Sequence, residues 1–228
     1  MQLIIPMSGI GKRFLDVGYK IPKPLIEVEN KEIIAHIVNM FPGLESVFFI
    51  CNKIHLEDKS LRLESRLKEI SPNCKVISID PHKKGPIFAI LKSIEAFDPS
   101  LPSIVNYCDF NCIWDFEGFK NHVQKSDCDG CIVTYTGFHP HMLGNTNYAY
   151  LKLQDSNIVD VQEKKPFTSN PMQEFASSGT YYFKSVKLME KYFKKTVERN
   201  LNVKGEYYVS MSFKPMIEDK LKITKYNL

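Results

Sequence analysis

Short apolar runs alternate with amphipathic stretches over the first 138 residues of this 228-residue chain. The runs LIIP at 3–6 and SVFFICN at 46–52 are typical of buried strands, and the stretch 31–41 between them has helical spacing of its apolar residues. Strands and helices that alternate in this way form parallel sheets through helical crossovers. Because the strand runs lack polar alternation, we expect helices on both faces of the sheet. The chain therefore predicts an α/β fold with a Rossmann-like, mostly parallel sheet.

The expected elements continue along the whole chain. Strands are expected at 3–6, 46–52, 75–80, 103–108 and 131–138, with helices between them at 31–41, 56–70, 86–97 and 115–126. After residue 138 the pattern changes to a hairpin that turns at Asp155-Ser156-Asn157, then a strand ASSGTYYFK, helices at 185–199 and 206–219, and a strand KLKITKY. There is no clear linker, so we expect one domain over 1–228, made of a half 1–138 and an elaborated half 139–228.

Charge and hydropathy argue against two kinds of partner. A net charge of +4 is too small to predict nucleic-acid binding, although it suits a small anionic ligand if the cations cluster. No run approaches the roughly 18 apolar residues of a membrane span. The start, MQLIIPM, lacks the basic region and the long apolar core of a signal peptide. We therefore expect a cytoplasmic protein that binds neither nucleic acid nor membrane.

The cysteines raise the question of a structural zinc. Four of the six have a spacing near that of a zinc ribbon, namely Cys108, Cys112, Cys128 and Cys131. Cys108 and Cys131 lie in apolar runs that we expect to be strands, where buried reduced cysteines are common. Disulfides are not expected in a cytoplasmic chain. We favour buried thiols over a zinc site.

The turn after the first strand reads Met7-Ser8-Gly9-Ile10-Gly11-Lys12-Arg13. It fits neither a dinucleotide fingerprint, since Phe14 stands at the third glycine position, nor a Walker A loop, whose spacing fails. The glycines allow backbone N–H groups to face an anion, and Lys12, Arg13, Lys20 and Lys23 lie within twelve residues of one another. The turn predicts a site for several phosphates. A plain turn with a solvated basic edge is the alternative.

Two further strands carry polar residues at the same sheet edge, where ligands bind in open parallel sheets. DPHKKGPIF at 80–88 follows the third strand with cations and a glycine, and Asp109 follows the fourth. A lone carboxylate there is well placed to hold Mg²⁺ between phosphates, although a turn or cap aspartate is the alternative. His139 and His141, two residues apart, suggest a metal, but we favour a pocket or structural role for them.

Together these motifs resemble the signature of the sugar-phosphate nucleotidyltransferase (pyrophosphorylase) family. The resemblance begins with Gly9-x-Gly11-x-Arg13 and Pro22-Lys23-Pro24-Leu25. Further matches follow in order over essentially the whole chain, at Gly85, Asp109, QEKKP (162–166), SSGTYYF (177–183) and GEYYVS (205–210).

The resemblance implies a role for each matched residue. Residues 1–138 would bind a nucleoside triphosphate and residues 139–228 a phosphorylated small molecule. Catalytic roles fall to Arg13 and Lys23, which would meet the phosphates, and to Asp109, which would bind Mg²⁺. The nucleotide would be wrapped by Met7, Ser8, Gly9, Gly11, Lys12 and Arg13, with Gly85 near its base. The second substrate would meet Glu163, Lys164 or Lys165, Gly179 and Glu206.

The implied reaction is an in-line attack by a phosphate oxygen of the second substrate, a sugar 1-phosphate, on the α-phosphorus, with release of pyrophosphate. A phosphate monoester is already anionic, so positioning and charge neutralisation suffice without a strong base. Such products commonly feed surface polysaccharide assembly. The sequence leaves open the nucleotide base, which phosphorylated substrate is used, and any homo-oligomer.

Two departures from the family pattern leave alternatives. Met7-Ser8-Gly9 replaces the usual A-A-G, and the W-x-D-x-G-T segment with a second metal-binding Asp does not occur before the last residues, Asn227-Leu228. We therefore expect a piece of a longer protein, a member of a subgroup without that ligand, or an impaired enzyme. Glu206 is the candidate to replace the missing metal-binding Asp, and a helix N-terminal acid is the alternative. One alternative function is a cytidylyltransferase acting on an amino-alcohol or amino-acid phosphate. Another is a nucleotide-binding module without turnover.

Overall fold

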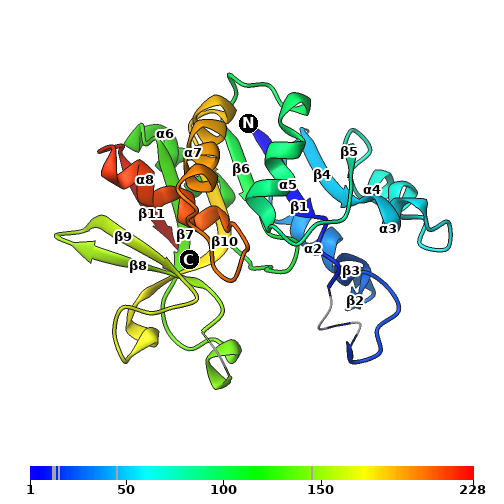
Figure 1. The fold of residues 1–228 in the computed structure, drawn as a ribbon, viewed down its shortest axis with the longest axis horizontal. Coiled ribbons are helices and arrows are strands. Elements are labelled where there is room, and N and C mark those ends of the chain that lie inside the picture. The colour runs from blue at the N-terminus through cyan, green and yellow to red at the C-terminus, as the bar shows by residue number, and fades with distance from the viewer. Residues whose placement is uncertain (12–13, 15, 45, 145) are drawn as a thin grey trace.

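The computed structural model describes residues 1–11, 14, 16–44, 46–144 and 146–228. Within these residues a nine-stranded sheet forms the centre, and seven of its strands follow the order β11-β7-β10-β6-β1-β4-β5 (Figure 1). Neighbours β6, β1, β4 and β5 are parallel, as expected. Their bounds are Gln2–Met7 (β1), Val47–Asn52 (β4), Lys75–Ile79 (β5) and Ser103–Asn106 (β6).

The other side of the sheet contains one reversed strand. β10 (Phe175–Phe183) lies between β6 and β7 (Gly130–Tyr135) and is antiparallel to both, whereas β11 (Ile223–Asn227) is parallel to β7. The predicted hairpin forms β8 (Ala149–Gln154) and β9 (Asn157–Glu163), and β8 joins the sheet through β10. The short strands β2 (Glu27–Val28) and β3 (Lys31–Glu32) pair separately. The sheet is mostly parallel, but the insertion of β10 was not predicted.

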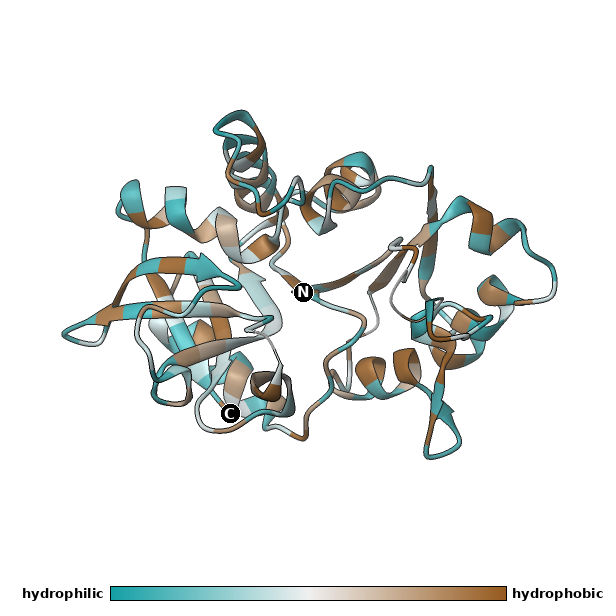
Figure 2. Ribbon diagram, turned by 60° about the horizontal axis from the view of Figure 1, so that its bottom comes forward, coloured by the Kyte–Doolittle hydropathy of each residue, from teal (hydrophilic) through white to brown (hydrophobic). Residues whose placement is uncertain are grey.

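Helices cover both faces of the sheet. One face packs against α2 (Ile33–Asn39), α4 (Leu63–Ile70) and α6 (Phe116–Ser126), and the other against α5 (Pro86–Lys92), α7 (Val186–Glu198) and α8 (Phe213–Glu218). Within β1, Leu3 and Ile5 belong to the first core and Ile4 to the second, all fully buried. Burial on both sides explains the unbroken apolar runs. Figure 2 shows brown bands along strands beside the N-terminus and teal on the outer loops.

Three helix predictions were wrong in their bounds. The stretch 56–70 is divided between α3 (Lys53–Glu57) and α4, because the Asp58 carboxylate accepts from the Ser60 N–H and hydroxyl at 2.9 and 2.6 Å and forms a local turn. The stretch 86–97 forms α5 and a 3₁₀ turn, η2 (Ile94–Ala96). In the stretch 206–219 the first helical turn is η5 (Val209–Ser212), followed by α8.

The remaining short 3₁₀ turns are η1 (Lys23–Leu25), η3 (Pro140–Leu143) and η4 (Pro171–Gln173). The strands expected at 103–108 and 131–138 end earlier, at Asn106 and Tyr135. None of the described helices is long and apolar enough to cross a bilayer.

Candidate functional site

The carboxyl ends of β1, β4, β5 and β6 meet at one edge of the sheet, and side chains connect them there. The Asn52 side chain, at the end of β4, donates to the Ser8 carbonyl at 3.2 Å. His82, after β5, places Nε2 3.5 Å from Ser8 Oγ. The turn after β1 therefore lies against the end of β4 and against the segment that follows β5.

The turn itself is described only in part. Met7 and Ser8 are buried, whereas Gly9 and Ile10 are exposed. Gly11 has φ +67°, in the left-handed region that favours glycine. The predicted phosphate ligands Lys12 and Arg13 lie outside the described residues. Their roles stay a prediction.

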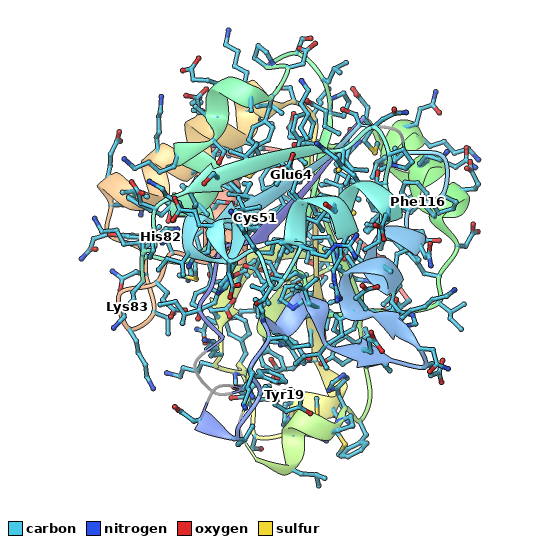
Figure 3. All side chains as sticks on the ribbon, turned by 90° about the vertical axis from the view of Figure 1, so that its right-hand side faces the viewer. Tyr19, Cys51, Glu64, His82, Lys83 and Phe116 are labelled. Carbon is cyan, nitrogen blue, oxygen red and sulfur yellow. The ribbon has the colours of Figure 1, made fainter. Side chains whose placement is uncertain are left out.

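His82 is held as a neutral imidazole. Its Nδ1 accepts from the Lys84 N–H at 3.2 Å, which assigns the proton to Nε2, facing Ser8. Burial, and then the Lys84 charge, lowers the pKa of His82. Lys83 is exposed and lies farther out than His82 at the same edge (Figure 3). This segment presents neutral and cationic groups together.

Lys23 and Asp109, which the sequence assigns to phosphate and to metal, form an ion pair of 2.7 Å. Their side chains are 24% and 42% exposed, so both are accessible to a ligand. Among the described residues, no three His, Cys, Asp or Glu side chains gather to hold a metal ion. A single accessible carboxylate fits Mg²⁺, which commonly takes one or two carboxylates and completes its shell with substrate phosphates and water.

Within the described residues the cysteines form no zinc ligand set. Cys128 and Cys131 are buried and Cys108 and Cys112 are half-buried, all as free thiols. Buried thiols were the favoured interpretation.

Gly85 allows two backbones to touch. Its φ is +81°, and a Cβ there would lie 2.8 Å from the backbone nitrogen of Tyr207. The Tyr207 N–H donates to the Lys84 carbonyl at 2.9 Å, and the Ile87 N–H donates to the Tyr207 carbonyl at 3.1 Å. This backbone contact is enough to explain why residue 85 is a glycine, so the predicted approach of Gly85 to a nucleotide base stays a prediction.

Glu163, the last residue of β9, is a buried carboxyl. It is 9% exposed and accepts from Ser210 Oγ at 2.6 Å. Burial raises the pKa of Glu163 to about 7, although the Ser210 hydrogen bond and Lys164 oppose the rise. A carboxyl with this pKa changes its charge near neutrality.

The two neighbouring lysines differ in their surroundings. Lys164 is half-buried and its ammonium contacts the Tyr208 hydroxyl, which also contacts the Glu206 carboxylate. Lys165 is exposed. Glu206 does not begin a helix, since η5 starts at Val209, so its interpretation as a helix N-terminal acid was wrong. Glu163, Lys164 and Glu206 lie together around Tyr208 and Ser210, and we assign the Lys of the family's E-K-P element to Lys164 as a proposal.

Gly179 lies where β10 passes the end of β6. Its φ is +81° at a register shift, and the Tyr107 N–H donates to its carbonyl at 3.0 Å. A Cβ there would lie 3.2 Å from the Tyr107 ring. Tyr107 also accepts the Val209 N–H on its hydroxyl at 3.0 Å. The segment carrying Asp109 is thereby joined to the C-terminal half.

Four half-buried rings gather beside Asp109. The centroids of Phe110, Tyr135, His139 and Tyr148 lie 5.2–6.2 Å apart. The Tyr135 hydroxyl is buried and has no hydrogen-bond partner among the described atoms. The carbonyl of Tyr148 accepts the Lys164 N–H at 2.9 Å. The ring cluster therefore lies between Asp109 and Lys164. The side chain of His141, the other histidine singled out in the sequence, lies outside the described part of the structure.

The family follows from a comparison with family models. The model described as Nucleotidyl transferase matches residues 3–212. The chain belongs to this family. A curated relative, mannose-1-phosphate guanyltransferase beta-A of Xenopus laevis, is 24% identical over 188 residues, which are 80% of this chain and 49% of that protein. The chain thus spans about half the length of that relative.

Solved structures agree with the fold of this chain. The nucleoside-diphosphate-sugar pyrophosphorylase of Vibrio cholerae RC9 is 18% identical with a TM-score of 0.74, covering 100% of this chain and 92% of that one. A UDP-glucose pyrophosphorylase complexed with UDP-glucose is 19% identical with a TM-score of 0.72, covering 99% and 90%. At these identities the likeness shows the fold, which confirms the expected Rossmann-like architecture.

Several residues of this candidate site were not predicted from the sequence. Asn52, His82, Tyr107, Tyr208 and Ser210 bridge the predicted residues. Tyr208 and Ser210 stand in GEYYVS, the segment that carries the resemblance, so that motif held the signal. The bridges of Asn52 and Tyr107 depend on the strand order, which local spacing does not give.

Proposed function

We propose that the chain transfers a nucleotidyl group from a nucleoside triphosphate to the phosphate of a phosphorylated small molecule and releases pyrophosphate. The observation that carries the proposal is the Lys23–Asp109 pair. Two residues 86 positions apart, assigned from sequence to phosphate and metal, lie 2.7 Å from each other at the ligand edge of the family fold. The glycine turn, the Gly85 segment and the Glu163–Lys164 pair surround that edge. Together these residues supply cations for two phosphorylated ligands and a carboxylate for Mg²⁺.

In the proposed reaction an oxygen of the acceptor phosphate forms a bond to the α-phosphorus. The bond from the α-phosphorus to the bridging oxygen breaks, and pyrophosphate leaves with the electron pair. Mg²⁺, when bound, supplies charge neutralisation between the phosphates. Lys23 and Arg13 would meet the triphosphate, and Lys164 the acceptor. Because an acceptor phosphate is anionic at neutral pH, the site needs close placement more than a base.

For the acceptor we propose a sugar 1-phosphate. The names of the Xenopus relative and of the solved pyrophosphorylases refer to sugar phosphates or nucleotide sugars. The product would be a nucleoside-diphosphate sugar, and a role in surface polysaccharide synthesis is part of the proposal.

One observation favours a second acceptor class, an amino-alcohol phosphate. The ring cluster of Phe110, Tyr135, His139 and Tyr148 lies beside Asp109, and aromatic faces attract an ammonium group. A phosphate bound at Lys164 would place its substituent near these rings.

Pyrophosphate release tests the proposal. The protein is incubated with each nucleoside triphosphate, Mg²⁺, and a panel of sugar 1-phosphates and amino-alcohol phosphates. We expect release with one base and one acceptor class. Asp109→Asn should lower kcat on the order of 100-fold, since a metal-held charge supplies several kcal/mol, while triphosphate affinity changes less. Triphosphate binding without release for every acceptor would favour the nucleotide-binding module.

A further inference from the structure

The segment Gly205–Ser210 lies across both halves of the candidate site. Tyr207 joins it to the Gly85 segment by two backbone hydrogen bonds of 2.9 and 3.1 Å. Val209 joins it to Tyr107, two residues before Asp109. Ser210 donates to Glu163. The segment is therefore fixed at three points around the place where both substrates are proposed to meet.

Tyr208 is the side chain of this segment that contacts Lys164, the lysine proposed to meet the acceptor phosphate. Its hydroxyl is within hydrogen-bond reach of Lys164 Nζ and Glu206 Oε2, and its ring centroid lies 4.2 Å from Lys164 Nζ. A hydroxyl can accept from the ammonium and donate to the carboxylate at once. This order of donors fixes the direction of the Lys164 side chain.

The backbone of Lys164 is also held by hydrogen bonds. Its φ is +59°, a conformation uncommon for a residue with a side chain. The Lys164 N–H donates to the Tyr148 carbonyl at 2.9 Å, and the Thr146 hydroxyl donates to the Lys164 carbonyl at 3.0 Å. Such backbone strain persists only when the surroundings impose it, and it is frequent at ligand sites. A flexible lysine is thus ordered before any ligand arrives.

We propose that Tyr208 is a positioning residue that holds the Lys164 ammonium where the acceptor phosphate binds. This inference rests on the proposed function. Without the hydroxyl, Lys164 turns to the Glu206 carboxylate directly, and its charge is neutralised away from the acceptor. Tyr208 acts through Lys164 and need not touch the substrate.

The adjacent tyrosine supplies a matched control. The Tyr207 hydroxyl donates to Asn200 Oδ1 at 2.9 Å, in an exposed position outside the candidate site. Tyr207→Phe removes the same atom from the same segment without touching Lys164. Any general loosening of the segment by a lost hydroxyl appears in both variants.

Steady-state kinetics of pyrophosphate release test the proposal. We expect Tyr208→Phe to raise the acceptor KM about tenfold, as for a lost hydrogen bond to a charged group, with the triphosphate KM within twofold. Tyr207→Phe should keep both KM values within twofold. An unchanged acceptor KM in Tyr208→Phe, or equal rises in both variants, overturns the proposal.

A double-variant cycle keeps the proposal testable if Tyr208→Phe is less stable to heat than the natural chain. If Tyr208 acts through Lys164, then Lys164→Met and Lys164→Met/Tyr208→Phe have the same acceptor KM. Additive effects overturn the proposal and indicate a structural role.

Lysine NMR gives a readout that does not need turnover. The Lys164 ammonium signal, identified by its loss in Lys164→Met, should exchange slowly in the natural chain and in Tyr207→Phe, and rapidly in Tyr208→Phe. Slow exchange in all three overturns the proposal. If the natural chain releases no pyrophosphate with any substrate, the proposed function fails while this measurement still decides the role of Tyr208.

Discussion

At the scale of single residues, the Lys23–Asp109 ion pair engages both groups. The Lys23 ammonium covers the carboxylate that a metal ion would need, and the Asp109 carboxylate neutralises the ammonium that a phosphate would need. An exposed ion pair of this kind contributes about 0.2–1 kcal/mol. Removing Lys23 should therefore have opposite effects on the two ligands. We predict that Lys23→Met weakens triphosphate binding but raises the affinity for Mn²⁺ alone about two- to fivefold, because Asp109 is released.

Paramagnetic broadening of amide signals near Asp109 during a Mn²⁺ titration measures this effect. Asp109→Asn is the control, in which the broadening should be lost. Equal Mn²⁺ affinity in the natural chain and in Lys23→Met would contradict the assignment of Asp109 to the metal.

Glu163 gives the site a pH dependence whose sign follows from its burial. The pKa of the folded state is raised to about 7, above the ordinary value of 4.5, so the folded state holds the proton more tightly than the unfolded state. Glu163 therefore contributes most to stability below pH 4.5, and this contribution is lost as the pH rises through 7. We predict that the natural chain loses about 2 kcal/mol relative to Glu163→Gln between pH 5 and 7.5.

Urea unfolding of both proteins at the two pH values checks this prediction. The comparison with Glu163→Gln cancels the titration of groups that the two proteins share. A constant difference between the two proteins would show that Ser210 and Lys164 stabilise the Glu163 carboxylate enough to cancel the effect of its burial.

At the scale of elements, the contact between the Gly85 segment and the segment Gly205–Ser210 depends on a missing side chain. Gly85 and Gly205 have similar φ values, +81° and +84°, but a Cβ at Gly205 meets nothing within 4 Å. We predict that Gly205→Ala costs about 1–2 kcal/mol from its backbone conformation alone. Gly85→Ala should cost clearly more, because backbone atoms of Tyr207 must move.

Chemical denaturation of the two variants measures the difference. Gly85→Ala should also weaken triphosphate binding, since the segment after β5 shifts with it. Equal losses of stability in both variants would show that the approach to Tyr207 is easily relaxed.

Local sequence signals predicted the elements better than their ends. The strand β1 and the hairpin at Asp155 follow from apolar runs and turn residues. The helix expected at 206–219 starts late, because the Tyr207 backbone forms hydrogen bonds with the Gly85 segment and this tertiary contact decides its conformation. The candidate site was predicted as separate residues at strand ends. Its bridging side chains, such as Tyr107, depend on the position of β10, which no local spacing encodes.

At the scale of the whole molecule, the single tryptophan reports on distant parts of the chain. Trp114 donates to the Met40 carbonyl at 2.8 Å and packs against Phe116 and Tyr226. If residues 1–228 are one domain, as we propose, its fluorescence and the far-ultraviolet circular dichroism should change together in urea. Separate midpoints would indicate two units that unfold independently.

The position of β10 also has a consequence for the order in which the sheet is completed during synthesis. β6 and β7 emerge from the ribosome first, yet they share no hydrogen bonds and are joined through β10, whose Thr180 bonds to Asn106, 74 residues earlier. Until Phe175–Phe183 has been made, the facing edges of β6 and β7 have no strand between them, and unpaired edges favour association with other chains. The boundary at residue 138 separates predicted roles, but the hydrogen bonds of the sheet cross it.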